Sequence, residues 1–320
     1  MSDLVLNTVI ILGSLGVLAA VILYFVSKKF YVKEDPRIDG LMDVLPNTNC
    51  GGCGYPGCRN FAEGLTKASE LNDYFCPVGG NEVMKQVADI LGMEAVERDP
   101  YVAVVRCAGS REHRKKVNNY DGAASCTIAT DLYSGDRGCA DGCVGLGECA
   151  DACDFEALFM NPVTMLPEVV EDKCTACNAC VTACPKDIIE LWPQGKKNKR
   201  IYVACVNEEK GGVARKECAV ACSGCAKCFD ECRYDAITIT NNLARIDPDL
   251  CKLCAECVEV CDSRNIMSDN VPEATLEKVA QRRERKKEKA RLAKEKEKEE
   301  RLAAKAAEKA TTTKPEDDAK

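Results

Sequence analysis

Cysteine is the residue that most constrains this chain, because its 320 residues contain 24 cysteines and a single histidine. Only 5% of the chain is aromatic and Trp192 is its one tryptophan, so no large aromatic core is available. A cysteine content this high is usual in short secreted scaffolds but not in a chain of this length. Bound metal is therefore the expected substitute for an apolar core.

An apolar run near the N-terminus extends from Leu4 to Val26, 23 residues without a charge. As a helix rising ~1.5 Å per residue it would span the hydrocarbon core of a bilayer. A cleaved signal peptide is the alternative, but the run is too long, no basic side chain precedes it and no small-residue cleavage site follows. Because Lys28, Lys29 and Lys33 come next, we expect a single-pass helix in the cytoplasmic (inner) membrane, with the N-terminus outside and the body in the cytoplasm.

Charge is distributed unevenly along the chain. Residues 271–320 carry 16 basic and 12 acidic side chains, and the other 270 residues have a formal net charge of −11. An acidic body does not fit a nucleic-acid partner, which requires a basic face. The charged C-terminal segment has no apolar stripe wide enough to pack, so we expect a solvated, partly helical tail; a binding arm for anionic lipid or an acidic partner is the alternative.

Regular structure is predicted for only a few segments between these ends. Asn60 to Leu71 and Asn81 to about Leu91 are expected to be short helices, the second with Val83 and Val87 on one face. Tyr101 to Arg106 is expected to be a strand. The polar stretch from Cys107 to Gly138 is expected to contain little regular structure.

Two cysteine-rich segments repeat each other, which indicates two homologous modules in tandem. The first four cysteines of each module share one spacing, and each set is followed by an aromatic residue, an acid and an alanine, and then by a second cysteine run. The first runs are Cys139, Cys143, Cys149, Cys153 and Cys218, Cys222, Cys228, Cys232; the second runs are Cys174, Cys177, Cys180, Cys184 and Cys251, Cys254, Cys257, Cys261.

The spacing of the run Cys174-x2-Cys177-x2-Cys180-x3-Cys184-Pro185 is that of bacterial ferredoxins. In that pattern three thiolates bind one cubane and the fourth reaches the neighbouring cluster. Zinc is the alternative, but it needs only four tetrahedral ligands and would leave thiols over in such tight runs. The sequence therefore predicts 4Fe-4S clusters.

Crossed ligation of this kind assigns the cysteines of the two modules to four clusters, and the N-terminal group, whose spacing is less specific, has the count for one more. Twenty cysteines are therefore predicted to be both the cofactor-binding and the metal-binding residues of about five 4Fe-4S clusters. The predicted ligands are Cys50, Cys53, Cys58, Cys76 for cluster A; Cys139, Cys143, Cys149, Cys184 for B; Cys153, Cys174, Cys177, Cys180 for C; Cys222, Cys225, Cys228, Cys261 for D; and Cys232, Cys251, Cys254, Cys257 for E.

Some ligand choices stay open at this point. Leu146 stands where a ferredoxin has its middle cysteine, so either Cys139 completes cluster B or that cluster has three irons. In the second module the ferredoxin spacing favours Cys225 and the repeat favours Cys218; we choose Cys225. The remaining four cysteines are expected to be buried free thiols, with a sixth cluster as the alternative. They are Cys107, Cys126, Cys205 and Cys218.

Motifs for substrate turnover are missing from the sequence. It contains no P-loop or HExxH motif, and no plausible nucleophile–base pair with His113. We therefore predict no catalytic residues in this chain and expect any nicotinamide or flavin chemistry to reside on partner subunits.

The order of anchor, CxxCxxxxC motif with a distant cysteine, and two ferredoxin modules resembles the B subunits of the Rnf complex. The resemblance covers about residues 1–270. Its specific features are Leu45-Pro46-x-x-Asn49-Cys50-Gly51-x-Cys53-Gly54, the stretch Gly142-Cys143-Val144-Gly145-Leu146-Gly147-x-Cys149 without a middle cysteine, and Val203-Ala204-Cys205.

This resemblance implies a non-catalytic subunit of a ferredoxin:NAD+ oxidoreductase that exports Na+ or H+, taking electrons from soluble ferredoxin and working with the other Rnf subunits in the lipid bilayer. A polyferredoxin of another membrane redox complex, hydrogenase or complex-I-like, and a zinc scaffold are the alternatives. The predicted fold class is α+β, with a transmembrane anchor (1–28), a small 4Fe-4S domain (29–95), a connecting segment (96–135), two tandem dicluster ferredoxin-like modules (136–193 and 194–270) and a helical or disordered charged tail (271–320).

Overall fold

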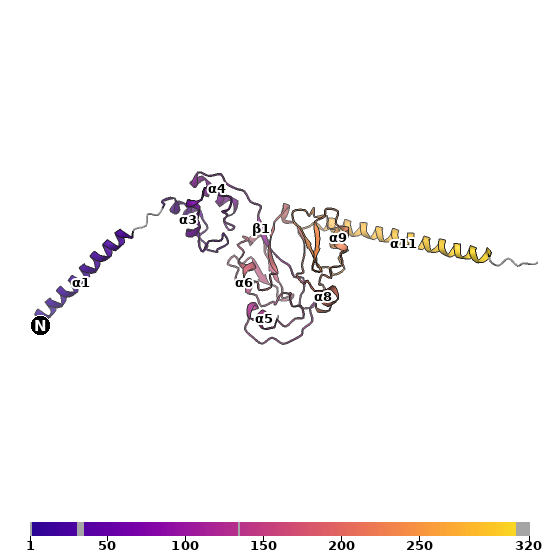
Figure 1. Ribbon diagram of the computed structural model, residues 1–320, viewed down its shortest axis with the longest axis horizontal. Coiled ribbons are helices and arrows are strands. Elements are labelled where there is room, and N and C mark those ends of the chain that lie inside the picture. Colours follow the sequence, from indigo (N-terminus) through magenta and orange to yellow (C-terminus); the bar gives the residue numbers. More distant parts are fainter. Residues whose placement is uncertain (1, 31–34, 134, 312–320) are drawn as a thin grey trace, which may run out of the picture. The chain divides into compact units, whose positions relative to one another are not determined.

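The computed structural model describes residues 2–30, 35–133 and 135–311 (Figure 1). It divides into two compact units, Met1–Val96 and Glu97–Lys320. Lys33, one of the lysines that predict the orientation in the membrane, lies outside the described residues, as does the end of the predicted tail from 312 to 320.

The first helix, α1 (Ser2–Lys29), contains the apolar run. Among the described residues, its segment Leu6–Lys29 is the one stretch of helix long and apolar enough to cross a membrane, and none of that segment is buried. Lys28 and Lys29 lie in its last turn. A continuous apolar helix with no buried face is what a membrane anchor requires.

Three more helices complete the first unit: α2 (Arg37–Val44), α3 (Cys58–Lys67) and α4 (Gly80–Leu91). The helices predicted from Asn60 and Asn81 are both present, although α3 ends four residues earlier than predicted. Their shared core includes Leu41, Phe61 and Val87, all nearly inaccessible to water. Helix α4 ends at Gly92, whose positive φ provides a left-handed C-cap.

The second unit contains two sets of strands with the same order along the chain. In the first set, β1 (Tyr101–Val105) pairs with β4 (Ile189–Pro193) around the hairpin of β2 (Leu158–Met160) and β3 (Pro167–Val169). In the second set, β5 (Arg200–Val203) pairs with β8 (Ile266–Asp269) around the hairpin of β6 (Ile237–Thr240) and β7 (Leu243–Ile246). All four pairs are antiparallel. The strand expected at Tyr101 thus belongs to the first set, although it was expected within a connecting segment.

Short helices join these strands. They are α5 (Cys126–Tyr133), α6 (Glu148–Asp151) and α7 (Ala179–Thr182) in the first set, α8 (Gly211–Glu217), α9 (Lys227–Glu231) and α10 (Glu256–Val260) in the second, and the 3-10 turns η1 (Glu171–Lys173) and η2 (Lys196–Asn198). A long helix, α11 (Glu273–Thr311), follows β8. Helix α5 lies within the stretch that was expected to contain little regular structure.

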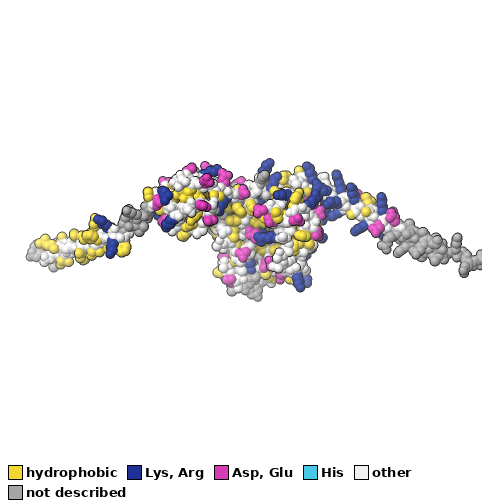
Figure 2. Space-filling model, turned by 45° about the horizontal axis from the view of Figure 1, so that its top comes forward, with side chains coloured by type: hydrophobic (Ala, Val, Ile, Leu, Met, Phe, Trp, Pro, Cys, Tyr) yellow, Lys and Arg dark blue, Asp and Glu magenta, His cyan; other side chains and the backbone are white. Residues whose placement is uncertain are grey.

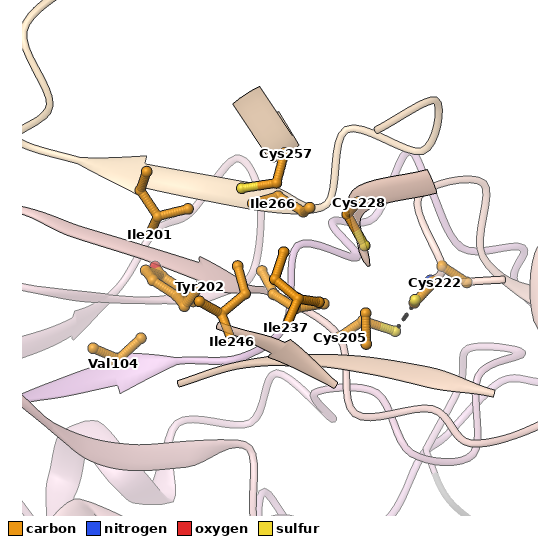
Figure 3. Packing of buried hydrophobic residues seen from close by; sticks show 14 of the residues in the cluster. Val104, Ile201, Tyr202, Cys205, Cys222, Cys228, Ile237, Ile246, Cys257 and Ile266 are labelled. Carbon is orange, nitrogen blue, oxygen red and sulfur yellow. Dashed lines mark hydrogen bonds between the residues drawn. The ribbon is translucent and has the colours of Figure 1, made fainter. Parts of the chain in front are cut away.

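Apolar side chains from both strand sets meet in one core (Figure 3). Val104 of β1 and Ile201 of β5 are both about 2% exposed, and Ile246 of β7 packs with them. The rings of Trp192 and Tyr202 lie 5.8 Å apart between centroids at 57°, so the single tryptophan also contributes to the contact between the two sets.

Buried arginine also connects the two strand sets. The Arg106 side chain, 3% exposed, donates from Nη1 to Glu190 Oε1 at 2.7 Å and to the main-chain carbonyl oxygens of Val203 and Cys205 at 3.3 Å. Burial raises the pKa of Glu190, but Arg106, Trp192 and Arg245 outweigh this effect and hold the pKa below its usual range. The guanidinium therefore joins β4 to the end of β5 and to the segment that follows it.

Replacing Arg106 with Met should lower the free energy of unfolding by about 2–4 kcal/mol, because Glu190 and two buried carbonyls lose their main donor. Arg245 is the matched control, since it pairs with the same carboxylate at 3.1 Å but is 61% exposed. Arg245→Gln should cost less than about 1 kcal/mol. The measurement is the midpoint of anaerobic chemical unfolding of the detergent-solubilised protein, and equal losses in the two variants would contradict this account.

Candidate iron-sulfur sites

The first cysteine set lies in the first unit and consists of Cys50, Cys53, Cys58 and Cys76. Cys58 is the first residue of α3, and its N–H donates to Asn49 Oδ1 at 2.9 Å. The Gly79 N–H donates to Cys76 Sγ at 3.4 Å. Burial raises the pKa of Cys76, and the other three thiols raise it further because they lie nearby. The structure brings together the four cysteines predicted for cluster A.

A second set lines one small cavity beside β1, and its members are Cys153, Cys174, Cys177 and Cys180. Two main-chain donors point at its sulfurs: Ala103 N–H to Cys174 Sγ at 3.4 Å and Ala157 N–H to Cys153 Sγ at 3.3 Å. Burial, with Cys174, Cys177 and Cys153 nearby, raises the pKa of Cys180 to about 12. These are the four cysteines predicted for cluster C.

Two further sets of cysteines lie in the second strand arrangement, the set of strands β5 to β8. Cys232, Cys251, Cys254 and Cys257 line one cavity, and burial followed by the neighbouring thiols raises the pKa of Cys257 to about 12. Cys228 has Cys222, Cys261 and Cys225 as its electrostatic neighbours, and its pKa rises to about 11, with burial as the main cause. The structure thus groups the cysteines predicted for clusters E and D, and Cys225 rather than Cys218 lies with Cys228.

A fifth set differs from the sequence prediction for cluster B. Cys143, Cys149 and Cys184 line one cavity, and the fourth cysteine there is Cys126 instead of Cys139. Cys126 is the first residue of α5. Glu148 accepts hydrogen bonds from the Ser125 hydroxyl and from the Thr127 N–H and hydroxyl, the last two at 3.0 Å. These contacts hold the start of α5 against α6, where the middle cysteine of a ferredoxin run is missing.

The sixth set contains three of the four cysteines that were expected to be free thiols, together with Cys139, which was predicted for cluster B. Cys107, Cys139, Cys205 and Cys218 line a single cavity together with Arg114 and Asn207. Asn207 Nδ2 donates to Cys139 Sγ at 3.6 Å, and the Cys222 N–H donates to Cys205 Sγ at 3.4 Å (Figure 3). Burial raises the pKa of Cys218, and Cys139 and Cys107 add to the rise. Each strand arrangement supplies two of the four sulfurs.

The internal repeat explains which cysteines meet in this sixth cavity. Cys107 and Cys205 each stand two residues beyond the first strand of their arrangement, since β1 ends at Val105 and β5 at Val203. Cys139 and Cys218 each stand four residues before the first ferredoxin-spaced cysteine. The cavity therefore contains two pairs of equivalent positions.

The described residues contain no three Cys, His, Asp or Glu side chains that converge as closely as the ligands of one metal ion. The thiolates of a cubane bind different iron atoms and so stand farther apart than the ligands of a single ion. All six sets consist of cysteine alone, which is the donor that iron-sulfur clusters use.

Comparison with known proteins identifies the family. The FeS family, an Fe-S cluster domain, matches residues 45–77, and the Fer4 family, a 4Fe-4S binding domain, matches residues 167–190. The chain is 41% identical over 269 residues, 84% of its length, to the B subunit of the Na+-translocating ferredoxin:NAD+ oxidoreductase complex of Acetobacterium woodii, and the match covers 79% of that protein. The chain belongs to the B subunits of Rnf-type ion-translocating oxidoreductase complexes.

Other Rnf-type B subunits extend this result. The B subunit of the ion-translocating oxidoreductase complex of Methanosarcina acetivorans is 37% identical over 83% of this chain and 99% of that protein. The B subunit of the proton-translocating ferredoxin:NAD+ oxidoreductase complex of Clostridium ljungdahlii is 37% identical over 80% of this chain and 91% of that protein. The resemblance recognised from the cysteine motifs is confirmed.

Replacing Glu148 with Gln should loosen the start of α5, because a neutral amide accepts hydrogen bonds more weakly than the carboxylate does. The Ser125 hydrogen bond, aided by Thr127, holds the pKa of Glu148 below its usual range, so the carboxylate is ionised at neutral pH. Limited proteolysis should cleave the segment around Cys126 several-fold faster than in the wild type. Glu156→Gln, at a side chain 87% exposed, is the control and should change nothing; equal cleavage of wild type and Glu148→Gln would refute the role of Glu148.

Proposed function

We propose that this chain is the electron-transfer subunit of a membrane-bound ion-translocating ferredoxin:NAD+ oxidoreductase and that it holds six 4Fe-4S clusters. It accepts electrons from reduced ferredoxin and relays them toward NAD reduction, which the complex couples to export of Na+ or H+. Membership of the Rnf B-subunit family supports the role. The grouping of all 24 cysteines into six sets of four supports the number of clusters.

The proposed ligand sets keep clusters A, C, D and E as the sequence predicts them and change the rest. Cys126 replaces Cys139 in cluster B, and Cys139 joins three other cysteines in a sixth cluster, F. The changed sets are Cys126, Cys143, Cys149, Cys184 for cluster B and Cys107, Cys139, Cys205, Cys218 for cluster F.

The surroundings of the sulfurs fit such clusters. Burial raises the pKa values of Cys143, Cys149 and Cys205 to about 12, so three buried thiolates would be unstable without a bound cation. When bound, 4Fe-4S clusters accept and release single electrons at potentials that depend on hydrogen bonds to sulfur, local charge and solvent exposure. The chain's own contribution is to supply those N–H donors, of which Ala103 and Asn207 are examples, and to exclude water.

Helix α1 is the proposed anchor, with Lys28 and Lys29 at its cytoplasmic end and the N-terminus outside. The cysteine-rich body would then lie on the cytoplasmic side, where soluble ferredoxin and NAD are available. The partners in the membrane are the other subunits of the complex. The relatives from A. woodii and C. ljungdahlii are named for different ions, Na+ and H+, so the choice of ion is assigned to those other subunits.

Substrate turnover is also assigned to partner subunits. The lone histidine, His113, has its Nδ1 2.9 Å from the hydroxyl of Ser110 in a loop, and the sequence contains no P-loop or HExxH motif. Nicotinamide and flavin chemistry therefore belongs elsewhere in the complex, and this chain connects it to ferredoxin.

Iron and sulfide analysis of the anaerobically purified full chain tests the proposal. Six clusters predict about 24 iron atoms per chain and five predict about 20. Cys126→Ser should lower the iron content by about one to four atoms or give the EPR signal of a three-iron cluster, and Cys139→Ser should do the same at a different site, so the double variant should lose about twice as much.

Cys177→Ser serves as the reference, because Cys177 is a ligand in every reading of the sequence. If Cys126→Ser retained the full iron content while Cys139→Ser lost iron, the revised set for cluster B would be wrong. A colourless protein containing zinc would contradict the proposed function as a whole and leave only a structural scaffold.

A further inference from the structure

The basic side chains of α11 are concentrated near its start. Residues 278–291, which we call the α11 basic segment, contain eight Lys or Arg side chains and two Glu. Figure 2 shows these dark-blue side chains where the helix leaves the second unit. The following residues 292–300 contain three Lys and four Glu, so the positive charge is confined to the part of the helix nearest the body.

Packing and ion pairs fix the start of α11 to the helices that carry cluster ligands. Val279 is 4% exposed, and Leu276 packs against the main core of the second unit. Arg282 Nη1 lies 2.6 Å from Glu256 Oε1, and the Glu256 side chain is only 8% exposed. Lys286 Nζ lies 3.0 Å from Glu231 Oε1. Glu231 ends α9 and Glu256 begins α10, so the basic segment has a defined position beside the cysteines of both helices.

The cysteine with the most exposed side chain lies in the same region. All 24 cysteines are among the described residues, and Cys225 is the exposed one. Its neighbours Gly224 and Ala226 both have positive φ, and at Gly224 an added Cβ would come within 2.6 Å of the Asn242 backbone, so the loop around Cys225 requires that glycine. Of the proposed cluster ligands, Cys225 is therefore the most accessible to a protein in solution.

Basic residues from three elements lie near Asp262, which follows Cys261 in the chain. One of them, Lys227, also lies close to Cys225. Lys227 of α9 forms an ion pair with Asp262, and Arg215 of α8 donates to the hydroxyl of Ser263 at 2.9 Å. Arg283 of α11 also lies close enough to Asp262 to interact with it electrostatically. Arg215, Lys227 and Arg283 thus bring basic side chains from α8, α9 and α11 to one region of the second unit, whereas residues 1–270 as a whole have a formal net charge of −11.

We propose that the α11 basic segment, with Lys227 and Arg215, is the docking surface for an acidic electron-carrier protein of the ferredoxin class, and that this partner transfers its electron at the site held by Cys225. The inference rests on the proposed function and adds the surface where the donor binds. A positive patch attracts an acidic protein and orients it, while the acidic remainder of the body repels it. The same charges placed away from an accessible cluster would recruit a carrier without bringing it close to its acceptor.

The composition of the helix favours a protein partner over a membrane surface. A helix that lies on a bilayer buries one apolar face in it. Between residues 280 and 300, α11 has only Ala280, Ala290, Leu292 and Ala293 as apolar residues, and Leu292 is 48% exposed. The segment therefore offers charge without an apolar face.

Two double charge-reversal variants of α11, each with its two substitutions four residues apart, test this surface. The variant Arg283→Glu/Lys287→Glu alters the basic segment, and Lys294→Glu/Lys298→Glu is the matched control, with the same charge change at the same spacing farther along α11. The full chain, in nanodiscs of neutral lipid, is titrated with a purified acidic 2[4Fe-4S] ferredoxin at low ionic strength. We expect the first variant to weaken binding at least about tenfold and to reduce its salt dependence, and the control to change Kd less than about threefold.

Equal effects of the two variants, or no effect of the first, would overturn the docking surface. Weaker binding to phosphatidylglycerol vesicles with unchanged ferredoxin binding would also overturn it, in favour of a lipid-binding segment. Iron content and dithionite-bleachable absorbance, measured on the same samples, test the proposed function separately. A fully loaded chain that binds ferredoxin regardless of charge reversal would refute this surface and leave the electron-transfer role intact.

Discussion

Sulfur atoms packed together away from water impose the main constraint on this structure. Burial and mutual repulsion raise the pKa values of the thiols in these sets, and several reach about 12. The secondary structure around them is slight, because every sheet among the described residues has only two strands and the longest strands have five residues. Isolated strand pairs of this size are marginal in water. Metal bound by converging thiolates would supply the cohesion that the sheets lack, so folding and cluster binding are expected to be coupled.

The cysteine sets that could be predicted from sequence are those whose ligands are close in the chain. In the runs from Cys174 and from Cys251 the spacing itself encodes the geometry, and the structure groups the first three cysteines of each run in one cavity and the fourth with a neighbouring set, as expected. The set of Cys107, Cys139, Cys205 and Cys218 comes from four separate segments, so no local spacing reveals it. The one feature of the sequence that points to this set is that Cys139 and Cys218 occupy equivalent positions in the repeat, which the ferredoxin spacing does not explain. No sequence pattern indicates Cys126 as a member of its set, because it is positioned there by the tertiary contacts of Glu148 with the start of α5.

The repeat also explains why the two strand arrangements form one body. Equivalent cysteines from each arrangement face one cavity, and Arg106 links β4 to the end of β5 and the segment after it through Glu190 and two carbonyl oxygens. Arg200 makes a comparable link, since its guanidinium contacts Glu171 of the first arrangement and Asp269 of the second. A site that needs sulfurs from both arrangements cannot survive their separation. The polar links therefore preserve the geometry of the shared site as well as the stability of the fold.

The start of α11 shows how few contacts are needed to convert a solvated charged helix into part of a folded surface. The sequence of this segment has no wide apolar stripe, and residues 284–300 of the helix are exposed. Two apolar side chains, Leu276 and Val279, and two ion pairs to α9 and α10 are sufficient to dock its first turns. Hydrophobic periodicity cannot reveal such an anchor, because its partners Glu231 and Glu256 lie on helices brought near only by the tertiary fold. Once docked, the helix holds at a fixed place a positive charge that a free tail would spread through solvent, and a fixed charge is what orients a partner before contact.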